Sequence, residues 1–418
     1  MNLGDVPRPV WVLAAGRFVG SMSSFLMLFL TLYLTGPRDL SVPLAGVIAG
    51  GYGVGMLVGN FTGGRWGDSF GHRRAMVVCS TVSGLGIAAV PWLPVPVLAV
   101  ALPPLAYLAA TASVSTGALS ALAVQRGDRR TSVAISRAAS NAGFVIGPPL
   151  GALIVAHSYD ALFVVDGLMT LAVRFAVAPM LPRDEPHVMR DPGAPSLWRA
   201  LRADRALMAL LPAVVLVDIV YRQLYTTVPI HLRDAGQPVA LYTALIAVGS
   251  GLILALEIPV ALRLRRFSSY PIIATGYALV GVGFAMFGLP VSAATAVLAM
   301  VVLTAGEILY KTTATAHVLD AAPDHLVGQY QGLYAGAATS GTMLAAPLGT
   351  AVYAAAPGLL WPLCGVAALA AAAGVLASGR RPDREPVTVS PQPAAQGRRS
   401  PEGTPPGSPG MAPPPRAG

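Results

Sequence analysis

The sequence has 418 residues, of which 54% are hydrophobic and only 11% are charged, and its formal net charge is +9. Soluble domains carry about 25% charged residues, so this composition excludes a soluble globular protein of this length. Apolar runs of about 20 residues recur along the chain, and a helix of that length crosses the hydrocarbon core of a bilayer. The sequence therefore predicts an all-α integral membrane protein.

Twelve membrane spans are predicted in chain order. The first is kept as a span rather than a cleaved signal, because its apolar stretch is too long and no small-residue cleavage site follows it. The two cysteines, Cys79 and Cys364, fall inside spans and are read as inert buried thiols. The predicted spans are 10–35, 43–64, 75–93, 96–124, 132–156, 160–181, 206–232, 239–262, 270–289, 291–320, 327–355 and 358–378.

Basic residues gather at the N-terminus, in alternate loops and in the tail, whereas the other set of loops holds only Arg38 and Arg233. This asymmetry follows the positive-inside rule. It predicts that both termini are cytoplasmic, in a multi-pass protein of the plasma (inner) membrane. The positive charge is thus an orientation signal, and no nucleic-acid partner is expected.

The spans divide into two sets of six. Residues 1–181 and 206–378 are predicted to be two six-helix bundles, joined by a cytoplasmic linker loop at 182–205, and a Pro-rich disordered cytoplasmic tail covers 379–418. The halves are weakly similar at an offset near 198: "SNAGFVIGPPLGALI" (140–154) then falls on "TSGTMLAAPLGTAVY" (339–353). Duplicated halves are typical of secondary transporters, which bind substrate between the halves near the middle of the bilayer.

Small residues recur at every fourth position in three spans, and so line one face of each helix. Such faces mark close helix packing in membranes. Static packing would explain them, but their matching places in the two halves also suit surfaces that slide during transport. They are Gly51, Gly55, Gly59 and Gly63 in the second span, Gly143, Gly147 and Gly151 in the fifth, and Gly341, Ala345 and Gly349 in the eleventh.

The segment "GGRWGDSFGHRR" (63–74) follows the second span. Together with the six-plus-six repeat it resembles the major facilitator superfamily, whose loop signature reads G-x-x-x-D-x-x-G-x-R-[KR]. In this chain the signature positions are Gly64, Asp68, Gly71, Arg73 and Arg74. The resemblance covers about residues 8–378 and implies two rocking bundles. It also implies that Asp68 closes an electrostatic latch against a helix N-terminus of the other half.

A second segment, "GFVIGPPLGA" (143–152), resembles the motif of the superfamily's antiporters through Gly143, Gly147, Pro148, Gly151 and Ala152. This resemblance favours the twelve-span drug:proton antiporters. One departure concerns the fourth span, where those exporters usually carry a basic residue. Here that span has no charge, so any proton coupling must use other residues.

The C-terminal half has two acid–base pairs at a spacing of four, Asp218 with Arg222 and Glu307 with Lys311. Tyr221, Tyr225 and Tyr310 lie beside them. Charged residues inside a membrane are costly and usually functional. Each pair is either an internally neutralised structural bridge or part of a proton and substrate site; the proton role requires an acid whose partner can move.

Other charges are placed closer to the ends of their spans. Arg17 lies one or two turns inside the cytoplasmic face and is kept as a candidate, with snorkelling as the alternative. Glu257 and Arg174 lie toward cytoplasmic ends, and Asp166 toward an outer end. No cluster has metal-ligand spacing and no nucleotide-binding loop is present, so no metal and no cofactor are expected.

The sequence thus predicts a secondary active transporter, and not an enzyme, that exports amphipathic small molecules in exchange for protons by alternating access. The expected partners are a small-molecule substrate, the proton and the lipid bilayer, and the protein is expected to be a monomer. The alternatives are an importer or uniporter of a specific metabolite, or, from another class, a membrane-embedded enzyme or receptor on the same scaffold.

Overall fold

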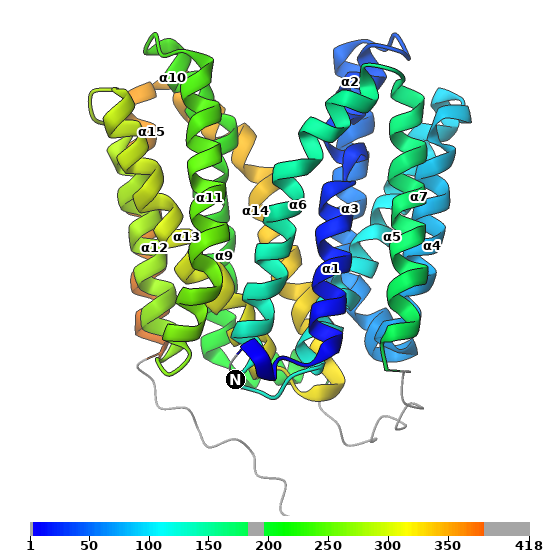
Figure 1. Cartoon of the computed structure of the whole chain (residues 1–418). Coiled ribbons are helices and arrows are strands. Elements are labelled where there is room, and N and C mark those ends of the chain that lie inside the picture. Colours follow the sequence, from blue (N-terminus) through cyan, green and yellow to red (C-terminus); the bar gives the residue numbers. More distant parts are fainter. Residues whose placement is uncertain (1–2, 183–195, 380–418) are drawn as a thin grey trace, which may run out of the picture. The chain divides into compact units, whose positions relative to one another are not determined.

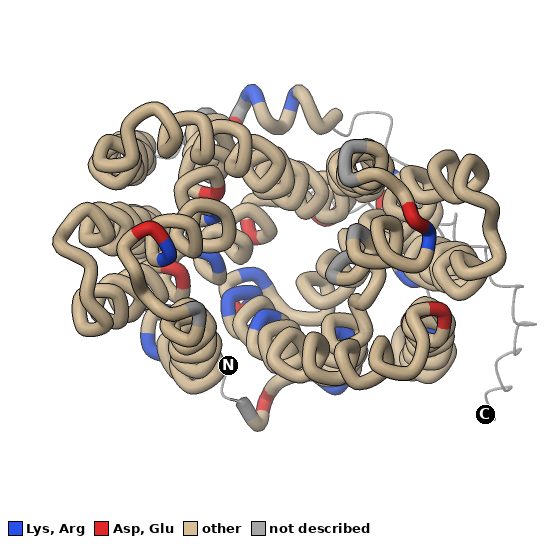
Figure 2. The backbone as a smooth tube through the Cα atoms, turned by 90° about the horizontal axis from the view of Figure 1, so that it is seen from above, with Lys and Arg blue, Asp and Glu red and all other residues tan. Residues whose placement is uncertain are grey.

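A computed structural model describes residues 3–182 and 196–379, in which every regular element is a helix. Most of the predicted linker and all but the first residue of the predicted tail lie outside these ranges. Within the predicted linker, α8 (Leu197–Ala203) forms a short helix. Figure 2 shows that most of the described backbone carries neither acidic nor basic residues, as a chain in contact with lipid requires.

The first half of the chain comprises seven α-helices, with short 3₁₀ turns between some of them. In this half α3 packs on α5, α1 on α6, and α4 on both α5 and α7. The helices are α1 (Arg8–Met22), α2 (Phe25–Thr35), α3 (Val42–Phe70), α4 (His72–Ala89), α5 (Val95–Leu122), α6 (Arg129–Val155) and α7 (Tyr159–Val177).

The second half repeats this order. Here α11 packs on α13, α9 on α14, and α12 on both α13 and α15. Three helices confirm the repeat, since α13, α14 and α15 each begin 198 residues after α5, α6 and α7. The helices are α9 (Arg205–Thr226), α10 (Val228–Asp234), α11 (Val239–Leu264), α12 (Ser269–Met286), α13 (Ala293–Ala321), α14 (Val327–Ala355) and α15 (Pro357–Gly379).

Ten helices of the described ranges are long and apolar enough to cross a membrane. The remaining two predicted spans correspond to α14 and to the pair α1 and α2. The helix α14 has 29 residues but is rich in Gly, Ser and Thr. The predicted span 10–35 is not one continuous helix, because α1 ends at Met22 and α2 begins at Phe25.

The break between α1 and α2 is stabilised by an acid from another helix. The carboxylate of Asp166 on α7 is buried, and its Oδ2 accepts a hydrogen bond of 2.9 Å from the backbone N–H of Leu26. The first N–H groups of a helix have no partner within it and favour a negative charge. Asp166 therefore satisfies the buried start of α2.

The three glycine faces pack against helices of their own half. A Cβ on Gly147 would lie 2.7 Å from the backbone oxygen of Met22 on α1, and one on Gly341 would lie 2.7 Å from Cβ of Asp218 on α9. The face on α3 meets α5 in the same way, at Gly59 and Gly63. These small residues serve close helix packing inside each half.

The two halves meet where α3 contacts α14, α6 contacts α11 and α13, and α5 contacts α14. At one end of the helices Gly64 of α3 lies directly against the backbone of Gly328, and a Cβ on Gly64 would overlap the Gly328 carbonyl. At the opposite end, Figure 1 shows α2 and α10 lying apart. The halves are therefore joined at the end that carries Asp68, called the Asp68 end below.

Candidate functional site

Asp68 joins the two halves at the Asp68 end. Its Oδ1 accepts a 2.9 Å hydrogen bond from the backbone N–H of Gly328, and its Oδ2 accepts one of 2.9 Å from Gln329. Both donors belong to the first turn of α14, where the helix dipole favours a carboxylate. Nε2 of His72 lies 3.2 Å from Oδ1. The structure thus places Asp68 against the helix N-terminus that the resemblance implies.

The signature segment that contains Asp68 was expected to be a loop, but it is mostly helical. The helix α3 continues to Phe70, so Gly64 and Asp68 lie on its last turns, and only Gly71 forms the turn into α4. Gly71 has a φ of 95°, a region that residues with a Cβ rarely adopt. Arg73 donates from Nε to the backbone oxygen of Ala178 at 2.8 Å. The interactions of Arg73 therefore extend to the end of α7.

A second set of contacts joins the halves at the Asp68 end. Arg126 donates to Oδ1 of Asp324 at 2.9 Å, and the backbone N–H of Gly127 donates to Oδ1 of Asp320 at 3.1 Å. Arg129 and Arg130 are buried and donate to the backbone oxygens of Leu319 and Leu264. These contacts connect the loop between α5 and α6, and the first residues of α6, to the end of α11 and to the end of α13 with the turn that follows it.

Glu307 of α13 is the centre of a buried polar cluster in the second half. Its side chain is buried, and Oε1 lies 3.0 Å from Nζ of Lys311, so the predicted pair forms. The hydroxyl of Tyr221 on α9 donates to Oε2 at 2.7 Å. Nζ of Lys311 also lies 3.5 Å from the centroid of the Tyr221 ring, a cation–π distance. The carboxylate therefore has a cation and a phenol as close partners.

Arg137 links this cluster to the first half. It lies on α6, and its Nε donates to Oε1 of Glu257 on α11 at 2.8 Å. Its Nη2 lies 3.4 Å from Oε1 of Glu307. Glu257 is 1% exposed and also accepts a hydrogen bond from Thr312. One guanidinium of the first half thus contacts two buried carboxylates of the second half.

The other predicted pair does not form. Among the described residues no ion pair joins Asp218 to Arg222, although the two share a face of α9. Asp218 is 4% exposed and packs on Gly341 of α14. Arg222 turns toward the ring of Tyr225 instead, with Cζ at 5.9 Å from its centroid. Asp218 thus contacts α14, and Arg222 lies near Tyr225.

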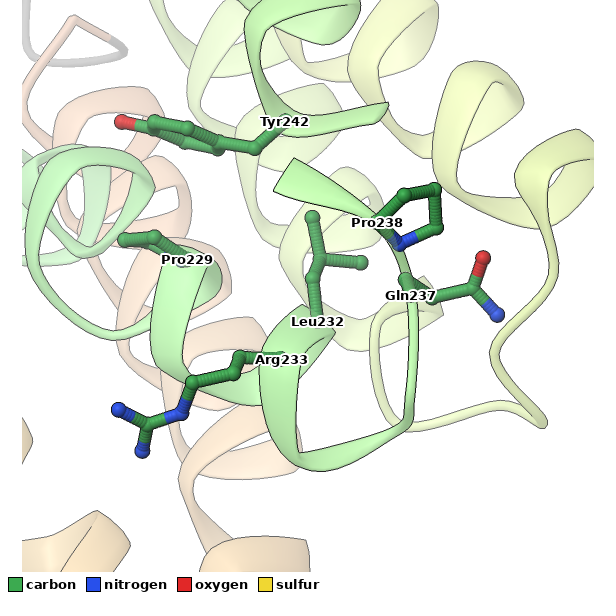
Figure 3. Close-up of a pocket in the computed structure, with 6 residues that line it drawn as sticks. All are labelled: Pro229, Leu232, Arg233, Gln237, Pro238 and Tyr242. Carbon is green, nitrogen blue, oxygen red and sulfur yellow. The ribbon is translucent and has the colours of Figure 1, made fainter. Parts of the chain in front are cut away.

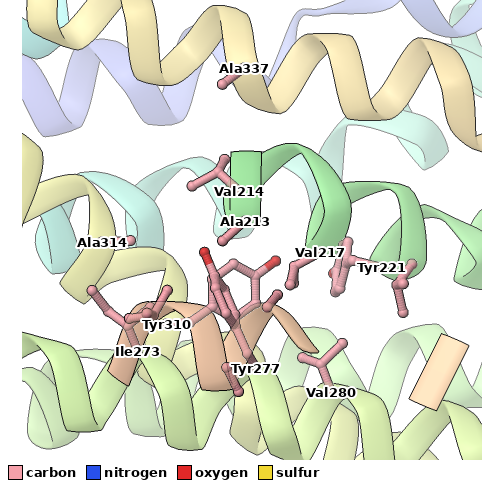
Figure 4. Close-up of a cluster of buried hydrophobic side chains, with 14 of the residues drawn as sticks. Ala213, Val214, Val217, Tyr221, Ile273, Tyr277, Val280, Tyr310, Ala314 and Ala337 are labelled. Atoms are coloured by element: carbon pink, nitrogen blue, oxygen red, sulfur yellow. The ribbon is translucent and has the colours of Figure 1, made fainter. Parts of the chain in front are cut away.

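Tyr310 lies beside the Glu307–Lys311 pair, with Nζ of Lys311 6.0 Å from its ring centroid, and it also belongs to an apolar cluster. Its ring packs edge-to-face on Tyr277 with centroids 5.0 Å apart, and its hydroxyl has no partner among the described residues. Figure 4 shows both tyrosines among side chains that include Val214 and Val280. Tyr221, rather than Tyr310, is the phenol that contacts Glu307.

Two arginines of the first half contact α5. Arg17 donates from Nη1 to Oγ of Ser113 at 3.0 Å and from Nε to Oγ of Ser136 at 3.3 Å. Arg174 donates from Nη1 to Oγ1 of Thr116 at 3.5 Å. The fourth predicted span has no charge of its own, yet it receives both guanidinium groups.

Two of the hollows on the described part of the chain lie beside α11. One, of about 50 Å³, lies between α10 and α11 and is smaller than ordinary ligand pockets. Figure 3 shows Pro229, Leu232 and Tyr242 around it. The other is an apolar groove of about 390 Å³ between α1, α6 and α11. No group of three or more His, Cys, Asp or Glu side chains suited to a metal was found in the described ranges.

Arg137 was not predicted to be an intramembrane charge, although it lies inside the predicted span 132–156. Glu257 was predicted only to lie toward the cytoplasmic end of its span. A usable signal existed, because a lone arginine at the sixth position of a predicted apolar span needs a partner. The acid that pairs with Arg137 is Glu257, which is 120 residues away in the sequence. No spacing rule within one helix could identify it.

Comparisons with known proteins agree with this architecture. The Major Facilitator Superfamily profile matches residues 12–341. The "Uncharacterized MFS-type transporter YqjV" of Bacillus subtilis (strain 168) is 26% identical over 347 residues, covering 78% of this chain and 82% of that protein. Two solved structures share the fold at lower sequence identity.

The human organic anion transporter MFSD10 (TETRAN) has a TM-score of 0.73 at 15% identity, covering 88% of this chain and 100% of that one. The E. coli fucose:proton symporter FucP has a TM-score of 0.66 at 14% identity, covering 88% and 98%. The helical repeat, the packing of the two halves and a family match over most of the sequence lead to one conclusion: this chain is a multi-pass membrane protein that belongs to the Major Facilitator Superfamily.

Proposed function

We propose that this protein is a proton-coupled exporter of amphipathic small molecules that works by alternating access in the plasma (inner) membrane. The observation that carries the proposal is the position of Glu307, whose carboxylate contacts Lys311 and Arg137, one from each half. A proton on Glu307 would remove the charge that attracts both cations. Coupling between protonation and the contact of the halves is what a proton-driven transporter requires.

Glu307 and Asp218 are proposed to differ in protonation in this state. Glu307 has three close partners and is ionised, whereas Asp218 is buried with no hydrogen bond or ion pair among the described residues. An ionised carboxylate without a partner is costly in an apolar interior. Asp218 is therefore proposed to hold a proton here. The cycle would exchange protons with at least one of these two acids.

The gating residues fit the same cycle. With both termini cytoplasmic, as the basic residues predict, the Asp68 end faces the cytoplasm and is closed. This state is then the outward-facing one. Opening to the cytoplasm requires Asp68 to leave the N-terminus of α14 and Arg126 to leave Asp324. Release of the proton from Glu307 to the cytoplasm would restore the contact between Glu307 and Arg137 for the next transport cycle.

Transport in everted membrane vesicles tests the proposal. Respiration acidifies the vesicle lumen, and a pH-sensitive dye reports the gradient while a panel of amphipathic compounds is added. An exporter that exchanges substrate for protons should dissipate the gradient when a substrate is added, and should accumulate that substrate inside. Substrate uptake that is unaffected by collapse of the gradient would indicate a uniporter. Substrate leaving the lumen together with protons would indicate a symporter that imports in the cell.

A further inference from the structure

Two partly buried arginines of the first half have no acidic partner among the described residues. Arg17 donates only to the neutral hydroxyls of Ser113 and Ser136, at 3.0 and 3.3 Å. Nε of Arg174 is buried and has no hydrogen-bond partner within the described ranges. Neither arginine takes part in an ion pair within those ranges. Charges inside a membrane are ordinarily paired or line a functional path, so this arrangement requires an explanation.

The two guanidinium groups lie on the same part of α5. Ser113 and Thr116, which they contact, are three residues apart and so share one helix face. Two like charges held close together in a medium of low dielectric repel each other, and this cost disappears when an anion lies between them.

Three buried acids of the described helices have other partners. Asp166 accepts from the start of α2, and Glu257 and Glu307 contact Arg137. The counter-charge for Arg17 and Arg174 must therefore come from outside the described chain. Guanidinium groups and hydroxyls together are well suited to the oxygens of a carboxylate or phosphate.

We propose that Arg17 and Arg174, with the hydroxyls of Ser113 and Ser136, form an anion site that binds the acidic head of an amphipathic substrate. The inference rests on the proposed function, because it names the substrate class of that transporter as organic anions. The same oxygen chemistry occurs in the phosphate of an anionic lipid headgroup, which the test must separate.

Binding without any gradient tests the site independently of proton coupling. The full chain is reconstituted in phosphatidylcholine nanodiscs, and equilibrium dialysis measures the affinity for 2-naphthoate and for the matched cation 2-naphthylmethylammonium. Naphthoate should bind and the cation should not. Arg17→Gln and Arg174→Gln should each weaken naphthoate binding at least about tenfold, as expected for loss of a charged hydrogen bond. Arg65→Gln, an exposed arginine, should change nothing.

Thermal unfolding of the same samples separates binding from folding. Because Arg17 has no acid partner, Arg17→Gln should leave the melting temperature of the ligand-free protein unchanged or raised, while abolishing the increase that naphthoate causes.

Three results would overturn the inference. One is equal binding of naphthoate to wild type and both glutamine variants, and another is equal binding of the cation. The third is stabilisation by phosphatidylglycerol nanodiscs through Arg17 without any effect of naphthoate, which would assign the site to lipid. Transport of cations with a normal proton response, but no anion binding, would leave the exporter intact and refute only the anion site.

Discussion

Gly64→Ala should open the Asp68 end. The added Cβ would overlap the Gly328 carbonyl and lie 2.7 Å from the nitrogen of Gln329, so α3 and α14 must separate. The atoms displaced belong to the residues whose N–H groups bind Asp68 at 2.9 Å. Each hydrogen bond to a charged group contributes about 1.5–3 kcal/mol. Loss of one would shift the balance toward the opened state by about 10- to 150-fold.

Cysteine accessibility in everted vesicles measures this shift. The two native cysteines, both buried and free, are replaced by serine, and Gln331→Cys is introduced on α14 beside α5. A membrane-impermeant maleimide should label this cysteine at least about tenfold faster in Gly64→Ala than in the parent protein. Gly46→Ala, on the same helix with no atom near its added Cβ, is the matched control. Equal labelling of both variants in folded protein would refute the assigned contact.

Three further predictions concern the latch, the helix seam and the break in the first span. Asp68→Asn should reduce transport and raise cytoplasmic labelling at normal expression, and full transport with unchanged labelling would contradict the latch. Gly147→Leu would place a large side chain against Met22 and cost about 1–3 kcal/mol, giving a folded but locked or leaky protein; wild-type activity would show that this face is not a packed seam. Asp166→Ala leaves the N–H of Leu26 buried without a partner, so unfolding should become easier by about 1–3 kcal/mol, whereas Asp166→Asn should recover most of the loss. Equal melting temperatures for the alanine and asparagine variants would contradict the cap.

Local patterns predicted the helices well. Length and apolar character identify the spans, and the offset near 198 anticipated helices that begin 198 residues apart in the two halves. The break before Phe25 was missed because the residue that stabilises it, Asp166, lies 140 positions away from its partner Leu26. Periodicity within one helix contains no information about such a partner.

The candidate site was predicted in part for the same reason. Glu307 and Lys311 pair because a spacing of four brings them together on one helix. Asp218 and Arg222 have the same spacing and form no ion pair among the described residues; Asp218 packs on α14 and Arg222 lies near Tyr225. Arg137 joins the site through the contact of two halves, a tertiary feature that spacing cannot reveal. Spacing therefore predicted which residues were near each other, and the packing of the halves decided which of them interact.

The role of Glu307 in proton coupling is the central claim, and its neutralisation tests it most directly. Everted vesicles containing wild type, Glu307→Gln, or Glu307→Gln combined with Lys311→Gln are compared for accumulation driven by a pH gradient and for downhill exchange of the same substrate. We expect both variants to lose accumulation, and the double variant, which leaves Arg137 with Glu257, to retain downhill exchange. If the double variant accumulates substrate against its gradient as wild type does, the pair is only a structural bridge and the claim is wrong.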